Sequence, residues 1–211
     1  MKFPNAFAGV KKLYIAEILA IITLAFTLIT AIAAFFTIGV IDEGVEAAVN
    51  PSLAVTGVFT IITAILFLIA FVLDLVGLSQ AGKDEPTFKY ALCAAIIGIV
   101  ASAASGFLSE GTGKELLTLL YEIAMNLLEV FSIAGIMALA KKSMNPDMER
   151  RGTFLLKLIL TVIIIANVAD LIYRFFANGA VVLGIIAIVI DIIASLIYLG
   201  YLNRARKMLA E

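Results

Sequence analysis

Hydrophobic residues gather in six long runs along the chain, and the short stretches between the runs hold most of the charged residues. Each run has about 20 residues or more, which as a helix rising 1.5 Å per residue crosses a hydrocarbon core of roughly 30 Å. A segment inside a bilayer must satisfy its own backbone hydrogen bonds, so the runs predict helices rather than strands. The predicted spans cover residues 13–39, 53–78, 88–108, 116–140, 154–177 and 180–202.

The connections between the runs are too short to hold a soluble domain. Short connections favour antiparallel neighbours. We therefore predict an all-α polytopic integral membrane protein, a single membrane domain over residues 1–211 whose six transmembrane helices form three helical hairpins. No cleavable signal peptide is expected, because the first run continues to about residue 39 whereas the apolar part of a signal peptide has about 7–15 residues.

Composition agrees with this class and excludes several others. Hydrophobic residues make up 63% of the chain, and the mean hydropathy is +1.13; soluble domains have roughly 45–50% apolar residues. The net charge of −1 lacks the basic excess that binds nucleic acid. Cys93 is the single cysteine and histidine is absent, so a disulfide framework, a thiolate metal site and a histidine base are excluded.

Motifs of enzyme chemistry are missing as well. The sequence has no phosphate-binding loop, no dinucleotide-binding glycine pattern and no His-Glu-x-x-His zinc motif. These motifs place the backbone amides, bases or metal ligands on which such chemistry depends. We therefore expect no enzyme activity, no catalytic residues, no metal and no cofactor.

Basic residues are distributed unevenly between the two sides of the predicted bundle. Of the 15 Lys and Arg residues, only Lys114 and Arg174 fall on the side opposite the two termini. The first connection on that opposite side holds the acids Asp42, Glu43 and Glu46. Loops rich in Lys and Arg stay in the cytoplasm, so both termini are predicted to be cytoplasmic in a multi-pass cell-membrane protein. The expected partner is the lipid bilayer; other membrane subunits are compatible with the chain, and no ligand is indicated.

Acidic residues inside the runs are the most informative feature for function. Glu129 and Asp191 lie nearest the middle of their runs, with no basic residue close in sequence. A charged residue at bilayer depth costs roughly 2.5–3.5 kcal/mol on insertion scales, so it needs a partner, a proton or a function. Glu122, Asn126 and Glu129 follow i, i+4, i+7 spacing and therefore share one helix face.

Two further runs carry polar residues at helical spacing. Asn167, Asp170 and Arg174 follow i, i+3, i+7, and Asp191 is followed by Ser195 and Tyr198 at i+4 and i+7. Three such stripes on consecutive helices predict one shared polar interior in the second half of the chain. Asp170 and Arg174 also fit an ordinary intrahelical ion pair.

Nearer the basic side, Glu17, Asp74 and Lys157 fit a simpler interpretation, since side chains close to the interface can reach polar surroundings. Packing explains another pattern: Ala94, Gly98, Ser102 and Gly106 recur at i+4. A stripe of small residues lets a neighbouring helix approach closely. The third helix is therefore predicted to be central.

Two function classes remain open from the sequence. The first is a small transporter or permease subunit with a carboxylate-lined interior, in which Glu129 and Asp191 handle a proton or cation along a pathway that also includes Glu122, Asn126, Asn167, Asp170 and Arg174. The second is a non-catalytic membrane accessory, assembly, regulatory or immunity protein. In that class the buried acids serve only helix packing, as protonated groups that bond between helices.

Overall fold

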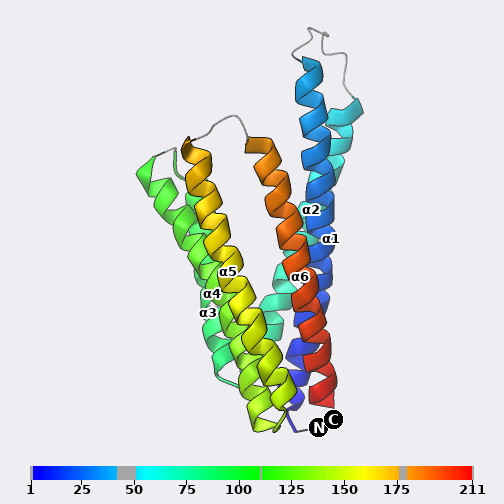
Figure 1. Ribbon diagram of the computed structural model, residues 1–211, viewed down its shortest axis with the longest axis vertical. Coiled ribbons are helices and arrows are strands. Elements are labelled where there is room, and N and C mark those ends of the chain that lie inside the picture. The colour runs from blue at the N-terminus through cyan, green and yellow to red at the C-terminus, as the bar shows by residue number, and fades with distance from the viewer. Residues whose placement is uncertain (1, 42–50, 110, 176–179, 211) are drawn as a thin grey trace. The chain divides into compact units, whose positions relative to one another are not determined.

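The structure is a computed structural model that describes residues 2–41, 51–109, 111–175 and 180–210, with side chains described in 2–33, 57–109, 111–164 and 185–210. Six α-helices occupy these ranges (Figure 1). Proline opens three of them, at Pro4, Pro51 and Pro146, where its missing N–H costs nothing. The helices are α1 (Pro4–Ile41), α2 (Pro51–Ala81), α3 (Thr87–Gly106), α4 (Thr112–Lys142), α5 (Pro146–Phe175) and α6 (Ala180–Ala210).

The prediction of an all-helical, membrane-type chain is confirmed. Within the described residues, five helical segments are long and apolar enough to cross a bilayer: Pro4–Ala33, Gly57–Ala81, Thr87–Gly106, Thr112–Lys142 and Ile185–Ala210. The predicted span 154–177 belongs to α5, and much of it lies outside the described side chains. The count of six spans and the hairpin pairing therefore stay predictions, as does the single domain.

Several helices are longer than the apolar runs that predicted them. α1 starts at Pro4 rather than residue 13, and α6 continues to Ala210 rather than residue 202. An apolar run marks only the length that suits hydrocarbon, whereas a helix continues into water until its hydrogen bonds find another partner.

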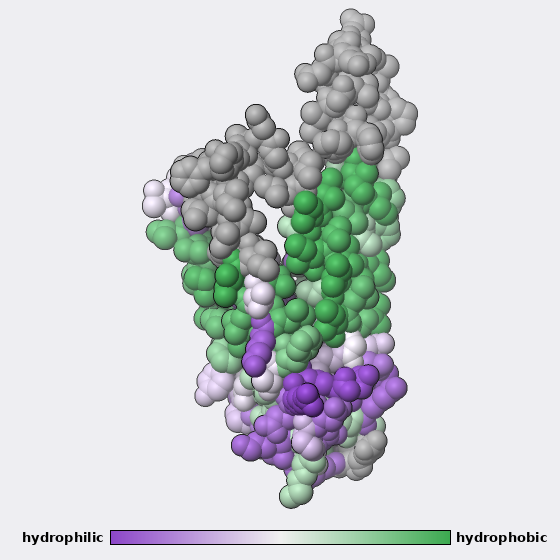
Figure 2. All heavy atoms as spheres, viewed as in Figure 1, coloured by the Kyte–Doolittle hydropathy of each residue, from purple (hydrophilic) through white to green (hydrophobic). Residues whose placement is uncertain are grey.

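The chain divides into two compact units whose borders fall within helices. Unit 1 comprises Met1–Tyr14, Leu73–Leu160 and Gly200–Glu211. Unit 2 comprises Ile15–Val72 and Thr161–Leu199. Hydrophilic residues are densest at one end of the view in Figure 2, and others lie further along the helices.

Unit 1 is held together by close approaches at small residues. α3 and α4 pack side by side, and a Cβ added to Gly98 of α3 would lie 3.4 Å from Ala124 Cβ of α4. α1 and α2 approach even more closely, because a Cβ on Gly9 would meet the backbone oxygen of Gly77 and would lie 2.7 Å from Ala81 N. Small residues therefore decide where backbones in this unit touch.

The small-residue stripe of α3 packs along only half of its length. Ala94 and Gly98 are buried, as the stripe predicts. Ser102 is exposed, and a Cβ on Gly106 would meet nothing within 4 Å among the described atoms. In its last turns α3 buries Ala101 rather than Ser102, and the central position of the third helix stays a prediction.

Unit 2 presents large apolar side chains on its surface. Phe26 of α1 and Phe59 of α2 contact each other with ring centroids 5.2 Å apart. Ile61 is 63% exposed and Leu68 is 62% exposed, as suits a lipid-facing surface. The hydroxyls of Thr23, Thr27 and Thr30 donate to carbonyls one turn earlier in α1. In hydrocarbon, that internal bond replaces water.

Candidate functional site

The predicted polar stripe of α4 lies on the same face as the part of the helix that is buried in unit 1. Glu122, Asn126 and Glu129 are followed at the same spacing of three and four residues by three side chains with no exposed surface. Residues so spaced share one helix face. The buried continuation of the stripe is Ile133, Ile136 and Ala140.

Along the stripe, burial changes abruptly at Glu129. Glu122 and Glu129 are exposed and Asn126 is half-buried, whereas Ile133 is fully buried one turn further on. On another side of the same stretch, Ala124 is buried opposite Gly98 of α3. The contact between Ala124 and Gly98 therefore holds α4 against α3. Glu122 and Glu129 lie on the helix face that is buried further along α4, but at positions where that face is exposed.

The stripe of α6 has the same register. Asp191, Ser195 and Tyr198 lead at three- and four-residue steps to Leu202, and Asp191 is exposed. The steps continue through Leu202, Ala205 and Leu209, which are 0%, 0% and 2% exposed. On both helices, therefore, the acid lies on the helix face that is buried closer to the C-terminal end of the helix.

Two other carboxylates also lie at helical spacing from buried leucines. Glu17 of α1 follows the buried Leu13 at the same spacing, and Asp74 of α2 precedes the buried Leu78 in the same way. Both acids are half-buried. Their interpretation as interfacial side chains stays a prediction, and their register places each of them one turn from a buried leucine. The sequence contains the four-residue spacing of Glu17 from Leu13 and of Asp74 from Leu78. It does not show that these leucines are buried, because hydropathy does not distinguish a buried apolar face from one that faces lipid.

The remaining predicted site residues cannot all be placed. Asn167, Asp170 and Arg174 belong to α5, and their side chains lie outside the described residues. Glu129 belongs to unit 1 and Asp191 to unit 2. The shared polar interior of α4, α5 and α6 therefore stays a prediction, and so does the intrahelical pair of Asp170 and Arg174.

The end of unit 1 near the termini carries a second polar cluster. Glu85, which is 5% exposed, accepts a hydrogen bond from Lys142 Nζ at 2.7 Å and another from Thr87 Oγ1 at 2.6 Å. Burial alone would raise the pKa of this carboxyl, but its bonds to Lys142 and Thr87 hold the pKa below its ordinary value. Lys2 Nζ in turn donates to the Lys142 carbonyl at 2.9 Å.

Asp84 caps the first turn of α1 from the connection between α2 and α3. Its carboxylate accepts the backbone N–H of Ala6 at 2.8 Å and the side-chain amide of Asn5 at 2.9 Å. Partial burial raises the pKa of Asp84, but these hydrogen bonds outweigh it, so the pKa lies below its ordinary value. The cluster ties together segments far apart in the sequence, which indicates a structural role.

Among the residues that the structure describes, no three His, Cys, Asp or Glu side chains are grouped so as to hold a metal ion. No protein-family model, curated protein or solved structure matches this chain. Functional inference therefore depends on the chemistry of its own side chains.

Proposed function

We propose that this membrane protein is a small transporter or permease subunit in which Glu129 and Asp191 bind and release a proton or a cation. The register of α4 supports the proposal. Glu122 and Glu129 are exposed carboxylates in the middle of an apolar helix, and they lie on the face that is buried further along the same helix. A charged residue in the middle of a membrane helix costs roughly 2.5–3.5 kcal/mol on insertion scales. Such a face is stable where it borders water, a ligand or a partner.

The proposed pathway consists of two ion-binding carboxylates and of further polar side chains on α4 and α5. Glu129 and Asp191 would neutralise the passing ion, since a carboxylate accepts a proton or coordinates a cation with its two oxygens. Glu122 and Asn126 would extend the pathway along α4, and Asn167, Asp170 and Arg174 would extend it along α5. The basic residues near both termini support a cytoplasmic location for the termini of this proposed cell-membrane protein.

The same exposure supports one competing function. If another membrane subunit covers the stripe of α4, the carboxylates would form bonds between helices and the chain would be an accessory protein. The two functions differ in whether the purified protein alone moves an ion.

The test uses the purified protein in lipid vesicles that contain either a pH-sensitive or a cation-sensitive dye. Under an imposed cation or proton gradient, wild-type protein should change the internal pH or the internal cation concentration. Glu129→Gln and Asp191→Asn should each lower the rate by about tenfold or more. Both variants keep the shape of the side chain and remove only its ionisable proton. Glu115→Gln serves as the matched control, because Glu115 is an exposed acid in the first turn of the same helix.

Folding must be separated from function in this experiment. Insertion into the membrane and thermal melts of both variants are therefore measured beside wild type, and transport rates are compared only between samples that are folded to the same extent. Wild-type vesicles without any proton or cation movement would reject the transporter proposal and favour the accessory protein. Unchanged transport in both variants would instead reject Glu129 and Asp191 as its site.

A further inference from the structure

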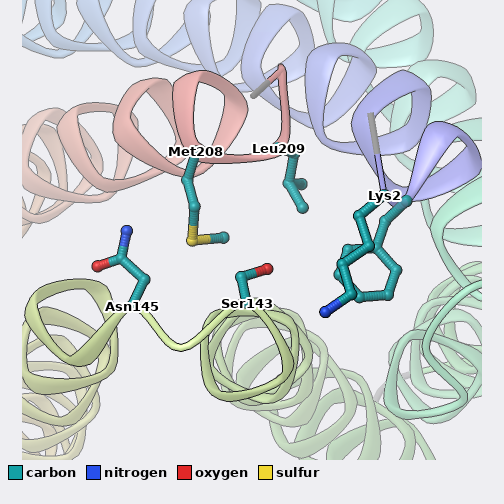
Figure 3. Close-up of a pocket in the computed structure, with 6 residues that line it drawn as sticks. Lys2, Ser143, Asn145, Met208 and Leu209 are labelled. Atoms are coloured by element: carbon teal, nitrogen blue, oxygen red, sulfur yellow. The ribbon is translucent and has the colours of Figure 1, made fainter.

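Unit 1 contains a cavity at the end that carries both termini. Its volume is about 240 Å³, and it opens between the N-terminal segment, the turn that joins α4 to α5 and the last turn of α6 (Figure 3). Three lining residues are polar and three are apolar. They are Lys2, Phe3, Ser143, Asn145, Met208 and Leu209.

Hydrogen-bond donors line the polar part of this cavity. Lys2 uses one N–H on the Lys142 carbonyl, which leaves further N–H groups of its ammonium to bind a ligand. Asn145 Oδ1 accepts the backbone N–H of Met148 at 3.1 Å, so the Asn145 amide nitrogen, with two donors, is the end left for the cavity. Ser143 adds a hydroxyl. No acidic side chain is among the lining residues.

Helix ends of both signs meet at this cavity, because the last turn of α6 carries partial negative charge and the first turn of α5 carries partial positive charge. The carbonyls that end α4 are satisfied by the chain itself, since those of Leu139, Ala140 and Lys141 accept backbone N–H groups and that of Lys142 accepts Lys2 Nζ. α5 begins immediately after Asn145, and its first turn also holds the acids Asp147 and Glu149, neither of which lines the cavity. The charge that faces a ligand is therefore that of the Lys2 ammonium.

We propose that this cavity binds the phosphate group of a phosphate ester. Lys2, Ser143 and the Asn145 amide would contact the phosphate oxygens, and Phe3, Met208 and Leu209 would contact the organic part of the ester. Lysine binds phosphate as a point charge, and hydroxyl and amide donors complete the set. The cavity is smaller than the roughly 300–1,000 Å³ of drug-sized sites, which suits one small head group.

The ester could belong to a lipid or be free in solution. Both sources present the same phosphate chemistry to the donors. The proposal is independent of ion transport, because none of the lining residues belongs to the carboxylate stripes.

Asn145→Asp is the decisive substitution. Aspartate keeps the oxygen that caps the Met148 N–H and favours a helix start as well as asparagine does. It replaces the amide donor by a negative charge that repels phosphate. The variant should fold and melt like wild type without ligand, yet bind phosphate esters at least tenfold more weakly. Lys2→Gln should weaken binding in the same direction.

Binding would be measured as thermal stabilisation of the detergent-solubilised protein by glycerol 3-phosphate. A parallel series would use nanodiscs of phosphatidylcholine with and without phosphatidic acid. Stabilisation by the soluble ester alone assigns a free ligand, and stabilisation only by phosphatidic acid assigns a lipid head group. Lys11→Gln is the control for loss of one exposed positive charge outside the cavity, and it should behave like wild type in both series.

Two results would overturn the proposal. One is wild-type protein that neither ligand stabilises. The other is a set of variants in which Asn145→Asp and Lys2→Gln respond to both ligands as wild type does, which would assign any stabilisation to general surface charge.

Discussion

The Glu85 carboxylate lies 2.7 Å from the Lys142 ammonium and joins the start of α3 to the end of α4. The side chain of Glu85 is 6% exposed and that of Lys142 is 47% exposed. If Glu85 is removed, the Lys142 ammonium can return to water, but if Lys142 is removed, the buried Glu85 carboxylate loses a bond that its position needs. Loss of Lys142 should therefore cost more stability than the exposure of Lys142 alone suggests, because it leaves the Glu85 carboxylate buried without this bond.

Glu85→Gln and Lys142→Met should both destabilise the protein. Because solvent screens the half-exposed lysine, we expect a coupling energy of about 0.5–1.5 kcal/mol in a double-mutant cycle. Unfolding in detergent, followed by circular dichroism, would measure it. Strict additivity of the two changes would show that the contact contributes nothing to stability.

Asp84 should make stability depend on pH in the acidic range. Its pKa is below the ordinary value of 3.8 in the folded protein, so its contribution is present above the unfolded pKa and is lost as pH falls through the folded pKa. Wild type should therefore lose stability below about pH 4. Asp84→Asn should be less stable at pH 7 and should lose less on acidification. A melting curve whose pH dependence is unchanged in Asp84→Asn would contradict the cap.

Gly9→Ala should be strongly destabilising, because the added methyl group would meet the backbone of α2 at Gly77 and Ala81. Overpacking of this kind costs about 1–3 kcal/mol, and a backbone contact cannot move aside as a side chain can. Gly200→Ala is the matched control, since its Cβ meets nothing within 4 Å among the described atoms. That change should stabilise α6 by about 0.5–1 kcal/mol through helix propensity. Equal melting temperatures for the two variants would refute the close contact.

Met144→Gly should stabilise the turn between α4 and α5. Met144 has a φ of 56°, in the left-handed region, and its side chain is 90% exposed. Glycine relieves the backbone strain and loses almost no buried surface, so we expect a gain of about 0.5–1 kcal/mol. Ser143→Gly, at a φ of −89°, has no such strain to relieve and should not stabilise. The comparison requires only thermal melts in one detergent.

The orientation can be tested with single cysteines in a Cys93→Ala background, which removes the exposed native thiol. Glu115→Cys should react with an impermeant thiol reagent added to sealed cells, and Lys83→Cys should react only after permeabilisation. Both positions are exposed, so access to the reagent depends on the side of the membrane. The reverse labelling pattern would invert the topology that the basic residues predict.

The sequence by itself determined the helices and the spacing of the polar stripes. Helix formation and the i, i+4, i+7 register of Glu122, Asn126 and Glu129 are local properties, since each depends only on neighbouring residues. The apolar runs likewise indicate a membrane protein without reference to any tertiary contact.

Only the tertiary structure decided which face of each helix is the core. Lipid is as apolar as a leucine side chain, so hydropathy does not distinguish Ile133, which is buried, from Ile123, which is 48% exposed. Ser102 shows the same limit, because a small residue permits a close contact without requiring one. The bond between Glu85 and Lys142 joins residues 57 positions apart. Such contacts depend on which helices pack against each other, and the residue pattern along one helix does not determine this.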